Sequence, residues 1–161
     1  MKIYRTAILP KGFLANGISC GIKKSGKPDL ALFYSLSPAQ ACCKFTSNKI
    51  VSAPIIFNRV NLKKSAYFNA ILVNSGNANC FTGKQGLNDA RKTASSLASC
   101  LAIQENNILL ASTGIIGRRL KAGLISKAMP RLKDGLSRER VNKAKLAILT
   151  TDTFPKAITV K

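Results

Sequence analysis

The sequence predicts an α/β fold, because short apolar runs typical of buried strands alternate with a strongly amphipathic helix along the chain. The clearest unit consists of the apolar run Ala70–Val73, a helical segment and the apolar run Ile108–Ala111. The chain has 161 residues, 46% of them apolar, so it can bury a core as one compact domain or as one half of a larger one.

The amino-terminal third of the chain predicts a β-hairpin followed by a helix. Pro10–Gly21 mixes glycines with apolar residues, as in an extended segment that approaches other backbone closely. Leu30–Ser35 is a buried strand, and the turn-forming segment Lys23–Asp29 joins the two. We expect a second short strand over Ala41–Thr46 and a helix that opens at Ala53–Pro54, since proline suits a first helical turn.

The central third predicts a strand, a polar loop and a long helix. The strand Ala70–Val73 runs into Asn74–Asn79, a cluster of turn formers that we expect to end it. We interpret Asn74, Asn77 and Asn79 as groups that organise this loop rather than as catalysts. Apolar residues spaced by three and four then mark one face of a helix that ends near residue 102: Leu87, Ala90, Ala94, Leu97, Ala98 and Leu101. Asp89 is assigned to its first turn, where a carboxylate complements the helix dipole.

A second polar turn is predicted directly after the apolar run Leu109–Ala111, where Ser112, Thr113 and Gly114 follow. In such a turn the Thr113 hydroxyl and the Gly114 N–H can point at one spot, as in an oxyanion hole for acyl transfer. The alternative is an ordinary strand-to-loop turn, because serine, threonine and glycine are common turn residues. The roles of Lys84 and Arg118, as solvated or as functional side chains, stay equally open.

The carboxy-terminal third predicts two helices and a third polar turn. The helices cover Leu124–Leu136, with Pro130 in the first turn, and Arg138–Ala147. A strand over Ala147–Leu149 is expected to break at the turn Thr150–Lys156, and a new strand to begin at Ala157 without a partner.

The composition limits the chemistry that this chain can carry. It has no histidine, which excludes imidazole general-base catalysis and a histidine metal site within the chain, and we predict no metal. The 26 basic and 6 acidic residues give a net charge of +20. The basic residues are scattered and lack interleaved aromatic side chains, so a solvated basic surface is favoured over a nucleic-acid site. The charge also suits the electrostatic steering of an anionic ligand.

The cysteines predict a reduced protein. They number five and form no C-x-x-C pair, which favours a cytosolic chain. Cys80 beside the asparagine-rich segment has no neighbouring base, and we interpret it as a small buried residue. The amino terminus lacks the apolar core of a signal peptide, and no run approaches the length of a membrane span.

The three polar turns, Asn74–Asn79, Ser112–Gly117 and Thr150–Lys156, follow GFLANGISCGIKKSGKPDLAL near the front of the chain. With this order, the sequence resembles the amino-terminal (α) part of the ornithine acetyltransferase family, the glutamate N-acetyltransferases of arginine biosynthesis. The resemblance covers Pro10 to Lys156. It implies a layered α/β sandwich that is incomplete without a β chain, with residues 1–161 as the α part and the carboxy-terminal β part absent.

The resemblance also implies a function. Such an enzyme moves the acetyl group from N-acetylornithine to glutamate without a cofactor, and some relatives accept acetyl-CoA as donor. A precursor cuts itself before a threonine, which becomes the acyl-accepting nucleophile of the β chain in an α2β2 assembly. Its new α-amino group, with a pKa of about 7.7 to 8.0, can serve as its base. The matching oxyanion-hole positions are Thr113 and Gly114, and Thr150 matches a substrate contact.

One departure from the family concerns the nucleophile. The family's α part continues past the Thr150–Lys156 turn to the cleavage point, and that segment is not in this sequence. We therefore expect the chain alone to be inactive. The alternative to an acetyltransferase part is an inactive truncated relative that acts as a basic nucleic-acid-binding module.

Overall fold

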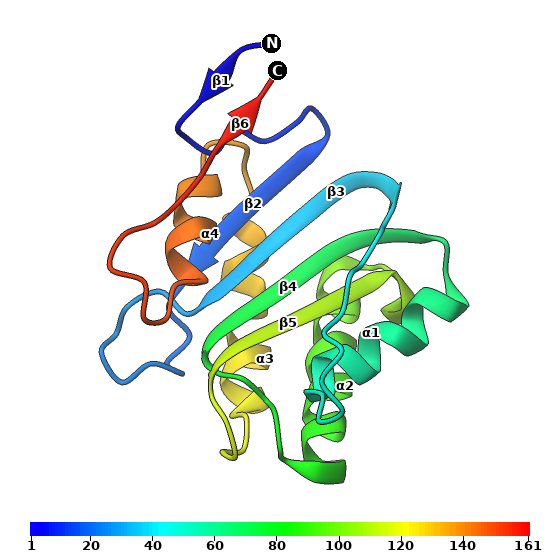
Figure 1. Ribbon diagram of the computed structural model, residues 1–161. Helices are drawn as coiled ribbons and strands as arrows, with labels where there is room; N and C mark the ends of the chain where they lie inside the picture. The colour runs from blue at the N-terminus through cyan, green and yellow to red at the C-terminus, as the bar shows by residue number, and fades with distance from the viewer.

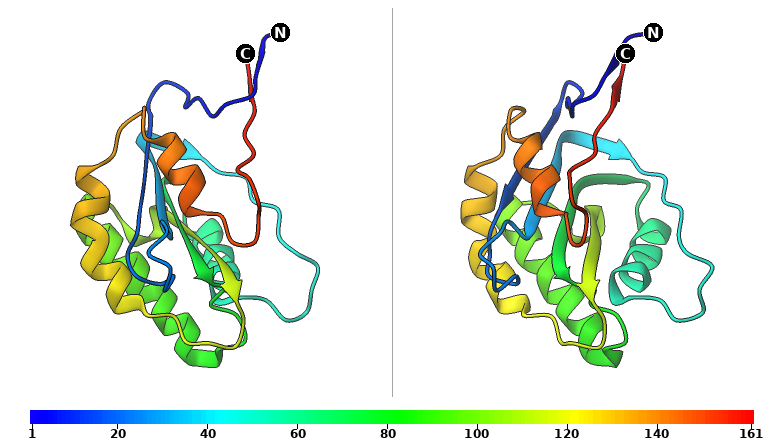
Figure 2. Two further views of the ribbon diagram at one scale, coloured as in Figure 1. Left: turned by 90° about the vertical axis from the view of Figure 1, so that its left-hand side faces the viewer. Right: turned by 60° about the vertical axis from the view of Figure 1, so that its left-hand side comes forward.

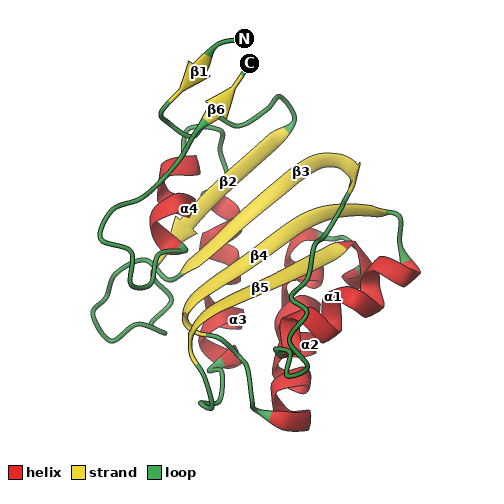
Figure 3. Ribbon diagram, in the orientation of Figure 1, coloured by secondary structure: helices red, strands yellow, loops and turns green.

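The computed structural model describes residues 1–161 and has a four-stranded sheet at its centre (Figures 1 and 3). In spatial order its strands are β2 (Phe13–Ile18), β3 (Leu30–Gln40), β4 (Tyr67–Asn77) and β5 (Ile108–Ile115). β3 is antiparallel to both of its neighbours, β2 and β4, whereas β5 is parallel to β4. The parallel pair brings the carboxyl ends of β4 and β5 to the same end of the sheet.

Helices lie on both faces of this sheet, so the fold has the layered α/β arrangement that the family resemblance implies. The helices are α1 (Ala53–Lys64), α2 (Gly83–Leu101), α3 (Ala122–Asp134) and α4 (Val141–Ala147), with a 3-10 turn η1 (Glu105–Asn107) before β5. Figure 2 shows α2 and α3 together on one face and α4 on the other.

The main core lies between the sheet and the α2–α3 layer. Alternate residues of the strands, such as Leu30, Leu72 and Leu110, point into it. The helices contribute side chains that are almost completely buried: Ala94, Leu97, Ile125, Met129 and Leu132. Burial of each of the larger side chains stabilises the fold by about 1.5–3 kcal/mol before entropy is counted.

A smaller core lies on the opposite face of the sheet, under α4. It contains Ala15 and Ala31 from the strands and Val141, Ala144 and Ala147 from α4. Gly17 of β2 lets this helix approach, since a Cβ at that position would collide with the backbone carbonyl of Lys143. Small residues on both elements therefore set the close contact of α4 with β2.

Helix α1 covers the open edge of the sheet at β5. The side chain of Asn58 donates to the carbonyl of Leu110 at 2.8 Å and accepts from the N–H of Leu110, also at 2.8 Å. Asn61 donates to the carbonyl of Ile108 at 3.1 Å. These amides take the place of a neighbouring strand, so the buried edge has no unsatisfied backbone groups at these points.

The two ends of the chain pair with each other beside the main sheet. β1 (Ile3–Tyr4) is antiparallel to β6 (Thr159–Val160), and the hydroxyl of Thr159 donates to the carbonyl of Thr6 at 2.7 Å. The strand expected near Ala157 therefore exists, but the prediction that it lacks a partner is wrong.

The first four residues of two predicted polar turns, Asn74–Asn79 and Ser112–Gly117, are in fact strand. β4 continues through Asn77, and β5 continues through Ser112, Thr113 and Gly114. Each residue of one segment pairs with one of the other, including Ser75 with Thr113. Turn formers can extend a strand when a parallel neighbour supplies the hydrogen bonds, and tertiary context here overrides composition.

Other boundaries also differ from prediction. Ala41–Thr46 is not a strand, because β3 already extends to Gln40 through an irregularity between Tyr34 and Ala39. Pro130 lies inside α3 rather than in its first turn, on the exposed side of the helix. The segment Ala147–Leu149 is the last residue of α4 and the two residues that follow it, not a strand.

The hairpin of β2 and β3 is confirmed, as are the helix that opens at Ala53–Pro54 and the long helix α2. Both carboxy-terminal helices are present with shifted bounds. In residues 1–161, no helix combines the length and apolar character that crossing a membrane requires.

Candidate functional site

A cleft of about 830 Å³ opens at the carboxyl ends of β4 and β5. Its wall is built from segments that lie far apart in the sequence. The lining residues are Gly21, Ile22, Lys23, Lys24, Gly76, Asn77, Thr113, Gly114, Ile115, Arg118, Arg119, Lys121, Thr150 and Thr151. All three predicted polar segments contribute to this wall, so the topology places them at one end of the sheet.

The cleft brings together every residue that the sequence nominates for a site. Thr113 and Gly114 come from the end of β5, and Thr150 comes from the segment after α4. Thr113 is half-buried, whereas Gly114 and Thr150 are exposed. A polar hollow at the carboxyl ends of parallel strands is a common location for ligand sites in α/β proteins.

Gly114 allows a close contact between β4 and β5 within this wall. Its φ of +131° is unfavourable for other residues, and a Cβ there would collide with the backbone of Gly76 and lie 2.6 Å from the nitrogen of Asn77. Gly76, at φ +96°, lies in turn against the side chains of Ile22 and Lys23. The glycines thus bring the β5 end, the β4 end and the segment after β2 into contact.

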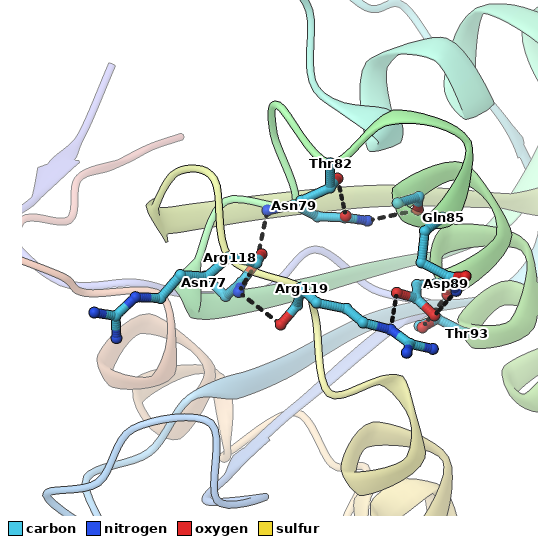
Figure 4. Close-up of polar contacts among 9 residues, drawn as sticks. Asn77, Asn79, Thr82, Gln85, Asp89, Thr93, Arg118 and Arg119 are labelled. Atoms are coloured by element: carbon cyan, nitrogen blue, oxygen red, sulfur yellow. Dashed lines mark hydrogen bonds and ion pairs between the residues drawn. The ribbon is translucent and has the colours of Figure 1, made fainter.

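Asn77 fixes the main chain that follows β5. Its Nδ2 donates to the carbonyl of Arg118 at 3.0 Å and of Arg119 at 3.3 Å (Figure 4). Its Oδ1 accepts from the N–H of Asn79 at 2.7 Å. Asn74 donates to the carbonyl of Asn77 at 2.8 Å. The interpretation of these asparagines as organising groups is confirmed, although the first two belong to a strand.

The neighbouring arginines Arg118 and Arg119 point in different directions (Figure 4). The Nε of Arg119 lies 3.4 Å from the buried carboxylate of Asp89, which also accepts from Gln85 at 3.0 Å. The prediction that Asp89 complements the α2 dipole from the first turn is wrong, because α2 begins at Gly83 and Asp89 is buried against Arg119. The Arg118 side chain extends the opposite way and makes no side-chain hydrogen bond within the chain.

The lining of the cleft carries a strong positive charge. It includes three lysines and two arginines, at positions 23, 24, 118, 119 and 121, and no acidic residue. A cleft lined with charge of one sign concentrates ligands of the opposite sign. The arrangement therefore suits an anionic substrate, and Arg118 is its uncommitted guanidinium. Lys84, exposed at the start of α2, does not line the cleft.

Asp29 supports the main chain of the segments that line the cleft, a role that the sequence alone does not predict. It is completely buried, and its carboxylate accepts from the N–H of Cys20 at 2.6 Å and of Lys23 at 2.9 Å. Its own carbonyl accepts from the N–H of Ser75 at 2.9 Å. The sequence signal that could have indicated its role is a single acidic residue directly before an apolar strand, in a chain with few acidic residues.

Cysteine chemistry has no support at this site. Burial, together with the nearby Asp29 carboxylate, raises the pKa of the Cys20 thiol to about 12, so this thiol stays protonated at neutral pH. No cysteine lines the cleft. No three carboxylate or thiol side chains come together as metal ligands anywhere in residues 1–161.

Comparison with known proteins finds relatives that all carry ArgJ or glutamate N-acetyltransferase names. The ArgJ family model matches residues 14–161. The chain is 45% identical over 153 residues to the arginine biosynthesis bifunctional protein ArgJ of Caldanaerobacter subterraneus subsp. tengcongensis, covering 95% of this chain and 38% of that protein. It is 44% identical over 155 residues to the glutamate N-acetyltransferase of Methanococcus maripaludis, covering 96% and 36%. The chain thus spans little more than a third of the curated relatives' length.

Solved structures agree with the fold. The Mycobacterium tuberculosis ornithine acetyltransferase, solved in complex with ornithine, superposes with a TM-score of 0.91 at 30% identity, covering 98% of this chain and 86% of that one. The Bacillus halodurans ArgJ protein gives a TM-score of 0.87 at 31% identity, covering 95% and 82%. These relatives give no support to a nucleic-acid-binding module. The chain belongs to the ArgJ family of ornithine acetyltransferases of arginine biosynthesis.

Proposed function

We propose that this chain is the amino-terminal part of an enzyme that moves the acetyl group from N2-acetylornithine to glutamate. The observation that carries the proposal is the cleft, which gathers Thr113, Gly114 and Thr150 into one basic hollow. The relatives named glutamate N-acetyltransferase and ornithine acetyltransferase support the substrate class.

In this proposal Thr113 and Gly114 form the oxyanion hole. A nucleophile attacks the acetyl carbonyl, whose oxygen becomes negative while ornithine leaves as the amine, and the amine of glutamate then takes the acetyl group from the enzyme. Donors fixed in advance stabilise that oxygen without reorganising. The N–H of Leu110 bonds to α1 rather than to β4, and in a regular strand the N–H groups of every second residue share a side. On this pattern we propose that the Gly114 N–H is free to donate to the oxyanion.

Arg118, the uncommitted guanidinium of the basic lining, and Thr150 bind the substrates. Both amino acids carry an α-carboxylate, and glutamate carries a second one. A planar guanidinium such as that of Arg118 pairs with a carboxylate through two parallel hydrogen bonds. Thr150 contributes a hydroxyl to the same cleft. The same positive lining is compatible with acetyl-CoA as an alternative donor, because its phosphates are anionic.

The nucleophile belongs to a carboxy-terminal part, as a threonine whose own α-amino group acts as base. Two observations support such a partner. The chain covers only 36% to 38% of the curated relatives but 82% to 86% of the solved chains, as expected when those relatives are cut in two. Ile71 and Ile115, on the sheet face opposite α2, are 44% and 51% exposed, so this face is open to a second chain. Two copies of each part would give an α2β2 assembly.

The test is to express this chain with the carboxy-terminal part of its own protein or, failing that, of the Caldanaerobacter relative. The purified assembly is incubated with N2-acetylornithine and glutamate, and N-acetylglutamate is measured by mass spectrometry. We expect steady turnover with N2-acetylornithine as donor. A second incubation, with acetyl-CoA in its place, tests the alternative donor. No transfer by a correctly assembled complex would contradict the proposal.

The chain alone provides the matched comparison. It has the proposed oxyanion hole and substrate contacts but no nucleophile, so we expect no N-acetylglutamate above the uncatalysed background. Turnover by the purified single chain would show that a residue within 1–161 accepts the acetyl group, and the division of roles would be wrong.

A further inference from the structure

Lys23 has an unusual environment for a lysine at the edge of a cleft. Its ammonium donates to the carbonyl of Leu149 at 2.6 Å and to the carbonyl of Pro28 at 2.9 Å. Burial lowers its pKa, and the nearby Asp29 carboxylate opposes part of that shift. Lysine side chains normally extend their charge into water. The Lys23 ammonium instead donates hydrogen bonds to two backbone carbonyls of its own chain.

The root of the Lys23 side chain is equally fixed. Its backbone N–H donates to the buried carboxylate of Asp29 at 2.9 Å. Its Cγ lies against Gly76, at 3.0 Å from where a Cβ would be, and Gly76 pairs with Gly114. The side chain thus starts beside the proposed oxyanion strand and ends at the residue that precedes Thr150.

The segment that carries Thr150 has few other attachments. Ser75 donates to the carbonyl of Ala147 at 2.5 Å, and Lys23 holds Leu149. From there to Ile158 the only hydrogen bond is internal to the segment, between Lys156 and Asp152. The bond from Lys23 is therefore the last link to the body of the fold before Thr150.

We propose that Lys23 is a positioning residue, which holds Thr150 at a fixed distance from the Thr113–Gly114 strand. It acts through the carbonyl of Leu149 and does not itself contact substrate, because its ammonium is already bound. The inference rests on the proposed function insofar as Thr150 contacts substrate. Fixing a binding group before the substrate arrives avoids the entropy cost of ordering it on binding.

The kinetic test uses the assembled enzyme with Lys23→Met, which keeps the stem and removes the ammonium. We expect KM for both amino-acid substrates to rise about tenfold, the usual order for a hydrogen bond to a charged group, with kcat nearly unchanged. Lys27→Met is the matched control, since Lys27 is exposed in the same segment between β2 and β3, makes no side-chain hydrogen bond and does not line the cleft, and we expect little change. Lys23→Arg, which keeps charge and donors, should restore most of the affinity.

A double-variant cycle tests whether Lys23 acts through Thr150. Thr150→Val should raise KM, and adding Lys23→Met to it should cause little further change, because the hydroxyl to be positioned is already gone. Independent, multiplicative effects of the two substitutions would overturn the proposal. So would a fall in kcat with KM unchanged in Lys23→Met.

A third measurement does not depend on catalysis. Thermolysin cleavage between Leu146 and Phe154, timed by mass spectrometry on the assembled protein, should be about tenfold faster in Lys23→Met than in Lys27→Met. Equal rates in the two variants would refute the link even if the enzyme is active. Faster cleavage in a complex without acetyl transfer would keep the link and overturn the proposed function instead.

Discussion

The two halves of β4 and β5 differ sharply although they belong to the same strands. The first halves carry apolar residues such as Leu72 and Leu110, which are buried against the helices. The second halves carry Asn74, which bonds to Asn77 and Ser112 of the same strand pair, and Asn77 and Thr113, which line the cleft. Parallel pairing continues without a break from one half to the other. The same backbone thus supplies stability at one end and a rigid polar site at the other.

This division predicts that substitutions separate stability from activity according to their position along the strand. Leu72→Ala should cause the largest loss of stability. The side chain is 2% exposed, and its removal leaves a cavity in the main core, so we expect a loss of about 2–5 kcal/mol in the free energy of unfolding. Urea denaturation measures it. The Leu72→Ala enzyme that stays folded should keep the kcat of the parent enzyme. A lower kcat of the folded variant would contradict the division between the two halves of the strands.

Thr113→Val should have the opposite profile. The substitution keeps the size of the side chain and removes the hydroxyl proposed for the oxyanion hole, so kcat of the assembled enzyme should fall by about 10²–10³. Ser112→Ala is the matched control on the adjacent position, where the hydroxyl instead bonds Asn74 at 2.6 Å. It should cost about 1 kcal/mol of stability and leave kcat within a few-fold. Equal kinetic effects of the two would contradict the oxyanion assignment.

Asn58→Ala tests the covered edge of the stable half. Removing this amide leaves both the N–H and the carbonyl of Leu110 without their partners, so we expect a loss of about 1–3 kcal/mol. Thermal or urea unfolding of the variant gives the value. Asn58 does not line the cleft, so KM should stay unchanged.

Cys20→Ala should have the smallest effect, visible as a dependence on pH. The thiol pKa is raised from its ordinary 9.0 to about 12 in the fold, so the folded state holds the proton more tightly than the unfolded state. Its contribution to stability is complete below about pH 9 and is lost as the pH rises toward 12. The stability difference between the parent chain and Cys20→Ala should therefore shrink as the pH rises from about 9 toward 12. A constant difference would refute the shifted pKa.

The helix α2 and the β2–β3 hairpin could be predicted from sequence because local patterns determine them. Apolar spacing from Leu87 to Leu101 specifies one helix face, and the turn formers between Gly21 and Leu30 specify the hairpin. The polar ends of β4 and β5 could not be predicted, because their strand conformation depends on each other across a long separation in sequence. Asparagine and glycine there indicated turns until the parallel partner was known.

The candidate site shows the same limit. The residues themselves do not reveal that Thr113 and Thr150 share one cleft, and only the family resemblance nominated them together. Lys23 and Asp29 escaped notice because a basic turn and a lone acid are ordinary in sequence, whereas their roles depend on bonds to Leu149 and Cys20.

The central claim is that this chain stabilises the oxyanion and binds substrate while the acetyl group is carried elsewhere. The most direct test is to incubate the assembled protein with labelled N2-acetylornithine and no glutamate, stop the reaction with acid, and map the label by mass spectrometry. We predict one acetyl group on an amino-terminal threonine of the carboxy-terminal part and none on residues 1–161. Stoichiometric label on a residue of this chain would contradict the account.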